Sequence, residues 1–203
     1  MMFEFLSAEY VLQAFGMIAL FGFVFAESGL FICFFLPGDS LLFTAGILAS
    51  KGFFGFWLIL AGVIIFAFLG DQAGYWTGNK FGPSFFCKEG SFFRNPKYVR
   101  KAQEFYDKHG KKAIVLARFV PVVRTFAPIL AGAAKMEYST FTAYNAIGGI
   151  LWSCLFLGAG YALGNVLPSS GEALTVIVLA IIFVSLLPVL YEVWGEYRSR
   201  KKK

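Results

Sequence analysis

The chain contains 203 residues, of which 58% are hydrophobic and only 15% are charged, and its formal net charge is +6. Its mean hydropathy is +0.69. Soluble domains contain about 25% charged residues, and a soluble domain of this length could not cover so much apolar surface with polar groups. The composition therefore excludes a soluble domain and indicates a single membrane domain, residues 1–203.

Charge-free stretches predict the helices that cross the membrane. A bilayer core about 30 Å thick is crossed by about 20 helical residues. One stretch is too long for a single helix, and residues 164–171, with two glycines, a proline and two serines, predict a loop inside it. We therefore expect about four transmembrane helices, which lie in the uncharged stretches 10–26, 52–70, 138–171 and 173–191.

The basic residues are concentrated beside these predicted spans. Nine of the 18 lysines and arginines lie in residues 80–112, and five lie in residues 198–203. By the positive-inside rule, both stretches are expected in the cytoplasm, the first as a basic amphipathic loop against anionic lipid. This explains the charge without nucleic acid, and no nucleic-acid partner is expected. Residues 1–50 contain no lysine or arginine, so we expect no cleavable signal peptide.

Two parts of the chain contain similar short motifs in the same order, which indicates an internal repeat. The spacing from Gly46 to Ala73 equals the spacing from Gly132 to Ala159. The predicted organisation is repeat 1 (about 28–79), a cytoplasmic loop (80–112), repeat 2 (about 113–165), a last span (about 173–193) and a basic tail (195–203). The recurring pieces are Phe35-Leu-Pro37 and Phe119-Val-Pro121, Ala45-Gly46 and Ala131-Gly132, and Ala73-Gly-Tyr-Trp-Thr-Gly-Asn79 and Ala159-Gly-Tyr-Ala-Leu-Gly-Asn165.

Each repeat contains an apolar segment that is interrupted by proline or glycine. The expected helix breaks are Pro37, Gly38, Pro121, Pro128 and Gly132, since proline removes a backbone donor and disrupts the preceding turn. If residues 113–134 crossed the membrane, the basic tail would lie outside, against the positive-inside rule. We therefore expect this segment to turn back, and its counterpart near residues 28–50 to do the same from the opposite face.

The predicted fold is accordingly an all-α integral membrane protein with about four transmembrane helices and two proline-broken re-entrant hairpins arranged as an inverted repeat. Both termini are expected in the cytoplasm. Inverted repeats with broken helices are a transporter design, in which the site lies near the membrane midplane.

Four charged side chains fall inside apolar stretches: Glu27, Asp39, Arg118 and Arg124. A charge at the bilayer centre costs about 3 kcal/mol on insertion scales, so we expect the two acids and two arginines to face each other or a watery cavity. Asp71 lies near the end of a span, and the sequence leaves open whether it joins this site or only caps or pairs at a helix end.

Two interpretations of these charges remain open. The arginines could hold an anionic head group, since a planar guanidinium binds two phosphate oxygens at once, with Glu27 and Asp39 as proton carriers or counter-ions. Alternatively, the charges could form two structural ion pairs without a substrate. The lone His109 lies in a polar loop and no acidic metal cluster is visible, so we expect no catalytic residue, metal, cofactor or phosphotransfer activity.

These residues lie in blocks that resemble the DedA family, which shares its core with eukaryotic VTT-domain (SNARE-associated Golgi) membrane proteins. The resemblance covers nearly the whole chain, without departure at the motif positions. The matching blocks are Glu27-Ser-Gly before Phe-Leu-Pro-Gly-Asp39-Ser, Gly70-Asp71 followed by Gly-Tyr-Trp-Thr-Gly, Ala117-Arg118-Phe-Val-Pro-Val-Val-Arg124-Thr-Phe-Ala-Pro, and the run from Tyr144-Asn145 through Gly148 to Trp152.

The resemblance implies a bacterial inner-membrane protein with two re-entrant hairpins. It also implies a link to translocation of phospholipid or undecaprenyl phosphate and to envelope homeostasis that depends on the proton motive force. The family's essential acidic pair and arginine pair correspond to Glu27, Asp39, Arg118 and Arg124.

The predicted function is thus a lipid translocase of flippase or scramblase type, coupled to protons and acting on a phosphate-bearing membrane lipid. Two alternatives stay open: a proton-coupled exchanger of small ions or drugs, and a membrane scaffold that transports nothing. The lipid, the direction of movement and the formation of homo-oligomers are also left open.

Overall fold

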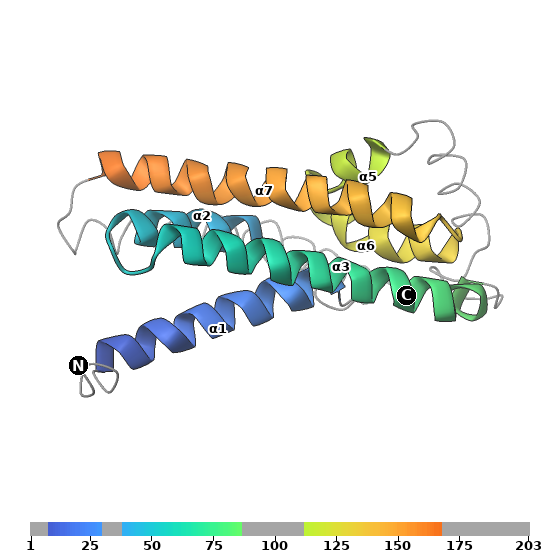
Figure 1. Ribbon diagram of the computed structural model, residues 1–203, viewed down its shortest axis with the longest axis horizontal. Coiled ribbons are helices and arrows are strands. Elements are labelled where there is room, and N and C mark those ends of the chain that lie inside the picture. The colour runs from blue at the N-terminus through green and yellow to red at the C-terminus, as the bar shows by residue number, and fades with distance from the viewer. Residues whose placement is uncertain (1–7, 30–37, 87–111, 168–203) are drawn as a thin grey trace, which may run out of the picture. The chain divides into compact units, whose positions relative to one another are not determined.

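The computed structural model describes residues 8–29, 38–86 and 112–167, and all regular secondary structure in these ranges is helical (Figure 1). The predicted all-α class is confirmed for this part of the chain. The helices are α1 (Ala8–Gly29), α2 (Gly38–Ser50), α3 (Phe56–Phe86), α5 (Lys112–Ala117), α6 (Pro121–Ala133) and α7 (Tyr138–Val166).

Two of the described helices are long and apolar enough to cross a bilayer. They comprise 26 residues of α3, Phe56–Phe81, and the 29 residues of α7. Even the shorter of the two extends about 39 Å, which exceeds a bilayer core of about 30 Å. They coincide with the spans predicted within 52–70 and 138–171. The described apolar part of α1, Ala14–Gly29, is shorter, and the predicted span at 173–191 lies outside the described residues.

Both long helices run further than the charge-free stretches suggest. Helix α3 continues through Lys80 to Phe86, so the start of the predicted loop is helical, and residues 87–111 lie outside the described ranges. Helix α7 continues to Val166, so the predicted loop at 164–171 is wrong for its first three residues, and residues 168–171 lie outside the described ranges. Gly164 instead packs against Ile47 and Ser50 near the end of α2, where a side chain would collide.

The proline-broken segment of the second predicted repeat contains one true break. Helix α5 ends at Ala117, and α6 begins at Pro121, which follows an extended Val120 (φ −109°, ψ 110°). Proline suits a first helical position because its missing N–H would be unpaired there, and it favours extended backbone in the residue before it. In the first repeat, α2 begins at Gly38, as predicted, while Pro37 lies outside the described residues.

Pro128 and Gly132 are not helix breaks, because α6 continues through both to Ala133. The prediction is wrong at these two positions. Pro128 removes only the N–H that would bond the carbonyl of Arg124 in a regular helix, and the rest of α6 remains helical. Gly132 serves close packing instead: a Cβ built on it would overlap the backbone carbonyl of Tyr75 in α3.

The chain divides into two compact units. The first combines residues 1–34 with 60–154, and the second combines residues 35–59 with 155–203. The first unit therefore contains α1, most of α3, α5, α6 and the first part of α7. The second contains α2, the beginning of α3 and the end of α7.

In the first unit, α6 lies against α3 through small residues. A Cβ on Gly78 would overlap the carbonyl of Ile129, and one on Gly74 would lie 3.2 Å from Cβ of Pro128. Together with Gly132 these glycines bring the two backbones into contact. Such small-residue packing is typical of helix association in lipid. Lipid tails are as apolar as the side chains, so moving apolar side chains from lipid into a helix contact gains no hydrophobic free energy.

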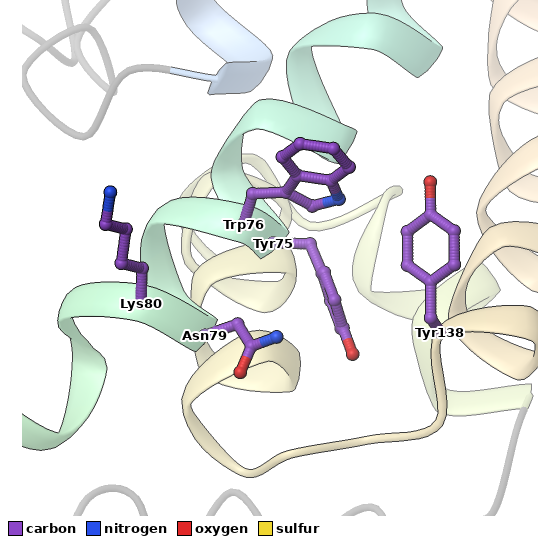
Figure 2. Close-up of a pocket in the computed structure, with 5 residues that line it drawn as sticks. All are labelled: Tyr75, Trp76, Asn79, Lys80 and Tyr138. Carbon is purple, nitrogen blue, oxygen red and sulfur yellow. The ribbon is translucent and has the colours of Figure 1, made fainter.

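A cavity of about 410 Å³ lies near the C-terminal part of this contact. It is lined by Tyr75, Trp76, Asn79 and Lys80 of α3 and by Tyr138 at the start of α7. Figure 2 shows the Tyr138 ring across the cavity from Trp76 and Tyr75.

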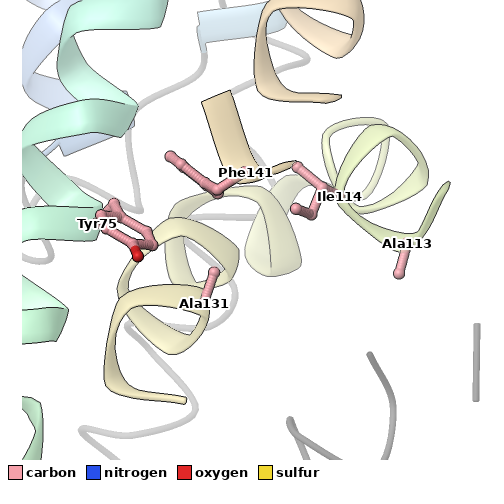
Figure 3. Packing of buried hydrophobic residues seen from close by; sticks show 5 residues of the cluster. All are labelled: Tyr75, Ala113, Ile114, Ala131 and Phe141. Atoms are coloured by element: carbon pink, nitrogen blue, oxygen red, sulfur yellow. The ribbon is translucent and has the colours of Figure 1, made fainter. Parts of the chain in front are cut away.

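The buried core of the first unit joins four helices. Phe141 of α7 lies between Tyr75 of α3 and Ile114 of α5 (Figure 3), and the rings of Tyr75 and Phe141 stack with their centres 4.6 Å apart. Ala113 and Ala131 complete the cluster. The tyrosine hydroxyl donates a hydrogen bond to the carbonyl of Met136, so this polar group is satisfied within an apolar core.

In the second unit, α2 lies against the end of α7 in the same manner. A Cβ on Gly46 would overlap the carbonyl of Leu157 and approach the backbone of Tyr161, and one on Gly160 would overlap the carbonyl of Phe43. Gly46 and Gly132 occupy equivalent positions of the predicted repeat. Their contact partners, Tyr161 and Tyr75, are also equivalent. The two contacts are thus equivalent in sequence, while the repeat itself stays a prediction.

Replacing Gly132 by alanine should destabilise the protein. The added Cβ meets backbone rather than a movable side chain, and overpacking of this kind costs about 1–3 kcal/mol. The matched control is Gly158→Ala in α7, where nothing lies within 4 Å of the new atom and a helical alanine gains about 0.5–1 kcal/mol over glycine. Unfolding of the purified proteins in detergent measures both; equal effects would contradict the close contact.

Candidate functional site

Two buried ion pairs lie in the first unit, and the first joins α1 to α6. The Nη2 atom of Arg124 donates a hydrogen bond to Oε1 of Glu27. The side chains are only 10% and 4% exposed, respectively. Because a buried charge is costly without a partner, this pair ties the C-terminal part of α1 to the first half of α6.

The second pair joins α3 to the turn between α5 and α6. Nη1 of Arg118 donates to Oδ2 of Asp71 and, at 2.6 Å, to Oδ1 of Asn145 in α7. The side chains of the ion pair are 7% and 4% exposed. Gly148 and Gly149 of α7 lie beside the arginine: a Cβ built on either would be 3.5 Å from its side chain, an ordinary contact distance. Arg118 is thus held by an acid, an amide and a side-chain-free patch of α7.

The backbone of the turn that carries Arg118 is itself hydrogen-bonded. The N–H groups of Arg118, Phe119 and Val120 donate to carbonyls three residues earlier, at 3.1–3.3 Å. The break in the helix therefore does not leave these donors unpaired. Because α6 also contacts both α5 and α1, the turn is fixed on several sides, and so is the position of the guanidinium.

A tryptophan connects the two ion pairs. The ring of Trp152 in α7 lies 5.1 Å from Cζ of Arg124 and 5.7 Å from Cζ of Arg118. The tryptophan is 2% exposed, and cation–π contacts away from water contribute about 2 kcal/mol each. The site is thus one cluster of two acids, two arginines and a shared aromatic ring, with its formal charges balanced.

Several buried polar atoms of residues next to this cluster in the sequence, or bound to it, have no hydrogen-bond partner among the described residues. They are Oε1 of Gln72, Oγ1 of Thr125, Nδ2 of Asn145 and Oγ of Ser153. Three of these residues directly follow Asp71, Arg124 and Trp152 in the sequence, and the fourth binds Arg118. An unsatisfied buried group costs about 1–3 kcal/mol, so these atoms are hydrogen-bonding capacity that the described residues leave unused, and Asn145 places one of them directly at Arg118.

The structure brings together Glu27, Arg118 and Arg124, as predicted, and adds Asp71 as a full member. The role that the sequence left open for Asp71 is therefore that of the carboxylate on Arg118. Asp39 lies in the first turn of α2 in the second unit and is half-buried. An acid is favourable at a helix N-terminus, and the grouping of Asp39 with the arginines stays a prediction.

Sequence reasoning assigned no role to Asn145 and Trp152, although a signal was present. The two residues are seven apart, which places them on one face of a helix two turns from each other. Gly148 and Gly149 lie between them in the sequence and are in contact range of the Arg118 side chain. Within the described ranges, no group of three histidine, cysteine, aspartate or glutamate residues could hold a metal ion.

Comparison with known proteins places this geometry in a family. Residues 36–162 match the family model of the VTT domain. The chain is 43% identical to Protein DedA of Escherichia coli K12 over 196 residues, which cover 96% of this chain and 88% of the relative. The chain belongs to the DedA family. The VTT domain match includes Asp71, both arginines and Trp152, while Glu27 precedes it.

Two further relatives of this DedA-family chain are named as membrane proteins. It is 46% identical over 179 residues to the uncharacterized membrane protein ML0287 of Mycobacterium leprae, covering 88% of this chain and 80% of the relative. It is 33% identical over 146 residues to the inner membrane protein YqjA of Escherichia coli K12, covering 72% and 66%. No solved structure matches the chain. The predicted family and the membrane location are confirmed.

The Asp71–Arg118 pair should show strong energetic coupling. Asp71→Leu leaves a buried arginine without its carboxylate, so we expect the free energy of unfolding to fall by about 3–5 kcal/mol. Asp71→Leu combined with Arg118→Leu removes both charges and should cost less than Asp71→Leu alone. Unfolding in detergent of the wild type, both single variants and the double variant gives the coupling energy. A double variant as unstable as the sum of the two single variants would rule the coupling out.

Proposed function

We propose that this DedA-family protein is a lipid translocase of flippase or scramblase type in the bacterial inner membrane. Its substrate is a phosphate-bearing lipid, such as undecaprenyl phosphate or a phospholipid, and its movement is coupled to protons. The observation that supports this most directly is the pair of buried arginines beside the break between α5 and α6, each bound to a carboxylate that a phosphate can replace.

The arginines suit a lipid phosphate by charge and by geometry. A guanidinium offers donors in a planar fork that matches two phosphate oxygens, and hydrogen bonds between ionised partners are about twice as strong as neutral ones. Trp152 supports both guanidinium groups from one side. Within the described ranges, the hydroxyls of Thr125 and Ser153 are buried without a partner and can donate hydrogen bonds, as the oxygens of a phosphate require.

Coupling to protons follows from the competition between carboxylate and phosphate. A proton on Glu27 removes the negative charge that holds Arg124, and the arginine becomes available to a phosphate. Loss of the proton restores the ion pair and releases the lipid. Asp71 has the same relation to Arg118, and we assign Asp39 as a further proton carrier because its charge lies in an apolar stretch.

The proposal includes the re-entrant hairpin formed by α5 and α6. These helices have 6 and 13 residues and contact each other, and at about 1.5 Å per residue neither spans a bilayer core of about 30 Å. Backbone that is not helical at membrane depth must be buried in protein or line water, and Arg118 at the break is buried. The equivalent glycine contacts of α2 and α6 support the inverted repeat.

Arg124→Lys should reduce lipid translocation by roughly tenfold or more, because lysine keeps the charge but loses the two-oxygen fork, and a hydrogen bond between charged groups contributes about 1.5–3 kcal/mol. The measurement uses purified protein in liposomes with labelled phosphatidylethanolamine or undecaprenyl phosphate. The control is Lys51→Gln, a cation of the second unit whose Nζ donates to the carbonyl of Leu167 at 2.7 Å; its rate should equal that of the wild type.

The same assay separates the alternatives. Wild-type rates in an Arg118→Lys/Arg124→Lys double variant would refute the assignment of the head-group site. If the wild type moves neither lipid but carries a small solute in response to a pH gradient, the protein is an exchanger of ions or drugs. If it moves nothing, the buried charges are structural and the scaffold interpretation holds.

Glu27→Gln should weaken the coupling of translocation to protons. The amide keeps the size of the side chain but cannot take up or release a proton, so Arg124 stays weakly held at every pH. We expect lipid crossing to continue with a smaller response to an imposed pH gradient, because Asp71 and Asp39 remain, and Asp39→Asn should act in the same direction. A pH response equal to the wild type in both variants would show that these acids carry no coupled proton.

A further inference from the structure

The cavity near the C-terminal part of α3 shares no lining residue with the cluster of ion pairs and Trp152. Within the described part of the chain, none of its lining residues takes part in an ion pair, and its volume of about 410 Å³ lies in the range of small-ligand sites, about 300–1,000 Å³. It is formed where the apolar part of α3 ends, at Phe81, and where α7 begins, at Tyr138. The cavity therefore lies at an end of both candidate membrane spans.

The side chains around the cavity are of the kind found at a membrane surface. Trp76 and Tyr138 are 64% and 45% exposed, and Figure 2 shows their rings on opposite sides of the cavity. Tryptophan and tyrosine are enriched at the level of the lipid head groups, because one end of each ring is apolar and the other can donate a hydrogen bond. Tyr75 is buried behind them, with its hydroxyl bound to Met136.

Two lysines add positive charge to the cavity. Lys80 is a lining residue, and Lys135 donates from Nζ to the carbonyl of Asn79, at 2.9 Å, and to the Asn79 side-chain oxygen. Both lysines are exposed. Among the described residues that line the cavity there is no acid, and the neighbouring Glu137 accepts hydrogen bonds from the hydroxyls of Ser139 and Thr140.

Lys135 occupies a backbone position where glycine is the usual residue. Its φ is +56°, the sole positive φ of a non-glycine residue in the described part of the chain. Its N–H donates to the carbonyl of Gly132, and that of Met136 donates to the carbonyl of Ala131, both at 3.0 Å. These bonds form a Schellman motif at the end of α6, in which glycine has no steric penalty. A residue kept in an unfavourable conformation points to a function for its side chain.

We propose that this cavity binds the phosphate of an anionic lipid head group, in the leaflet at the Phe81 end of α3 and the Tyr138 end of α7. Lys80 and Lys135 neutralise the phosphate, the amide of Asn79 and the hydroxyl of Tyr138 donate hydrogen bonds, and the Trp76 ring packs against the glycerol and upper acyl chain. The site differs from the arginine cluster and binds lipid whether or not the protein translocates it.

Photo-crosslinking in nanodiscs tests the proposal. Benzoyl-phenylalanine replaces Phe81, which is exposed, adjacent to Lys80 and not a lining residue. The matched position is Trp57, exposed near the other end of α3. The bilayer is phosphatidylethanolamine with a minority of phosphatidylglycerol, and mass spectrometry identifies the attached lipid. At position 81, we expect the fraction of crosslinked lipid that is phosphatidylglycerol to exceed the mole fraction of phosphatidylglycerol in the bilayer. At position 57, the two fractions should be equal.

The lysines should account for the enrichment. Each cation near an anionic surface raises lipid binding by about fivefold. The double variant Lys80→Gln/Lys135→Gly should therefore crosslink phosphatidylglycerol at position 81 only in proportion to its mole fraction in the bilayer. Lys135→Gly should not lower the melting temperature, because glycine suits the left-handed turn, and this separates lost binding from lost folding. The control Lys51→Gln should keep the enrichment, and so should Arg124→Lys, which disables only the proposed translocation.

Three results would overturn the proposal. The first is that the wild type crosslinks phosphatidylglycerol only in proportion to its mole fraction in the bilayer at both position 81 and position 57. The second is enrichment that survives removal of both lysines. The third is lysine-dependent binding of radiolabelled inorganic phosphate to the purified protein without any lipid enrichment, which would make free phosphate the ligand.

Discussion

The neutralisation of buried charge is the constraint on which the first unit depends. Arg124 can lie in an apolar environment only because Glu27 reaches it from α1, and Arg118 only because Asp71 and Asn145 reach it from α3 and α7. Each pairing joins helices that are far apart in the sequence, so the charges determine which helices are neighbours. Removing one partner leaves an uncompensated charge, which costs more than the pair contributes. Stability and the candidate site are therefore the same set of contacts.

The glycine contacts complement this electrostatic constraint. In lipid, apolar side chains do not drive helices together, and the backbones of α6 and α3 meet through Gly78 and Gly132 instead. This close approach sets the distance between α3, which carries Asp71, and the segment of α5, α6 and their connecting turn, which carries both arginines. A bulky residue at the contact would separate the charges as well as the helices. Packing and charge pairing thus require the same spacing.

Much of this arrangement could be predicted from the sequence, but not the pairings. Charge-free length predicted α3 and α7, and Pro121 marked the true break, because both signals are local. Pro128 and Gly164 were misleading because a helix interior tolerates them when a neighbouring helix packs closely. Which acid meets which arginine depends on helix neighbours, so the sequence left the role of Asp71 open. The family resemblance contained Trp152 without revealing that its ring contacts both guanidinium groups.

The interior proline of α6 has a mechanical consequence. Pro128 removes the backbone hydrogen bond to the carbonyl of Arg124, and helices bend most readily where such a bond is missing. The carbonyl that loses its usual partner belongs to Arg124, whose guanidinium binds Glu27. The backbone of α6 is therefore least restrained at the residue that carries the buried charge.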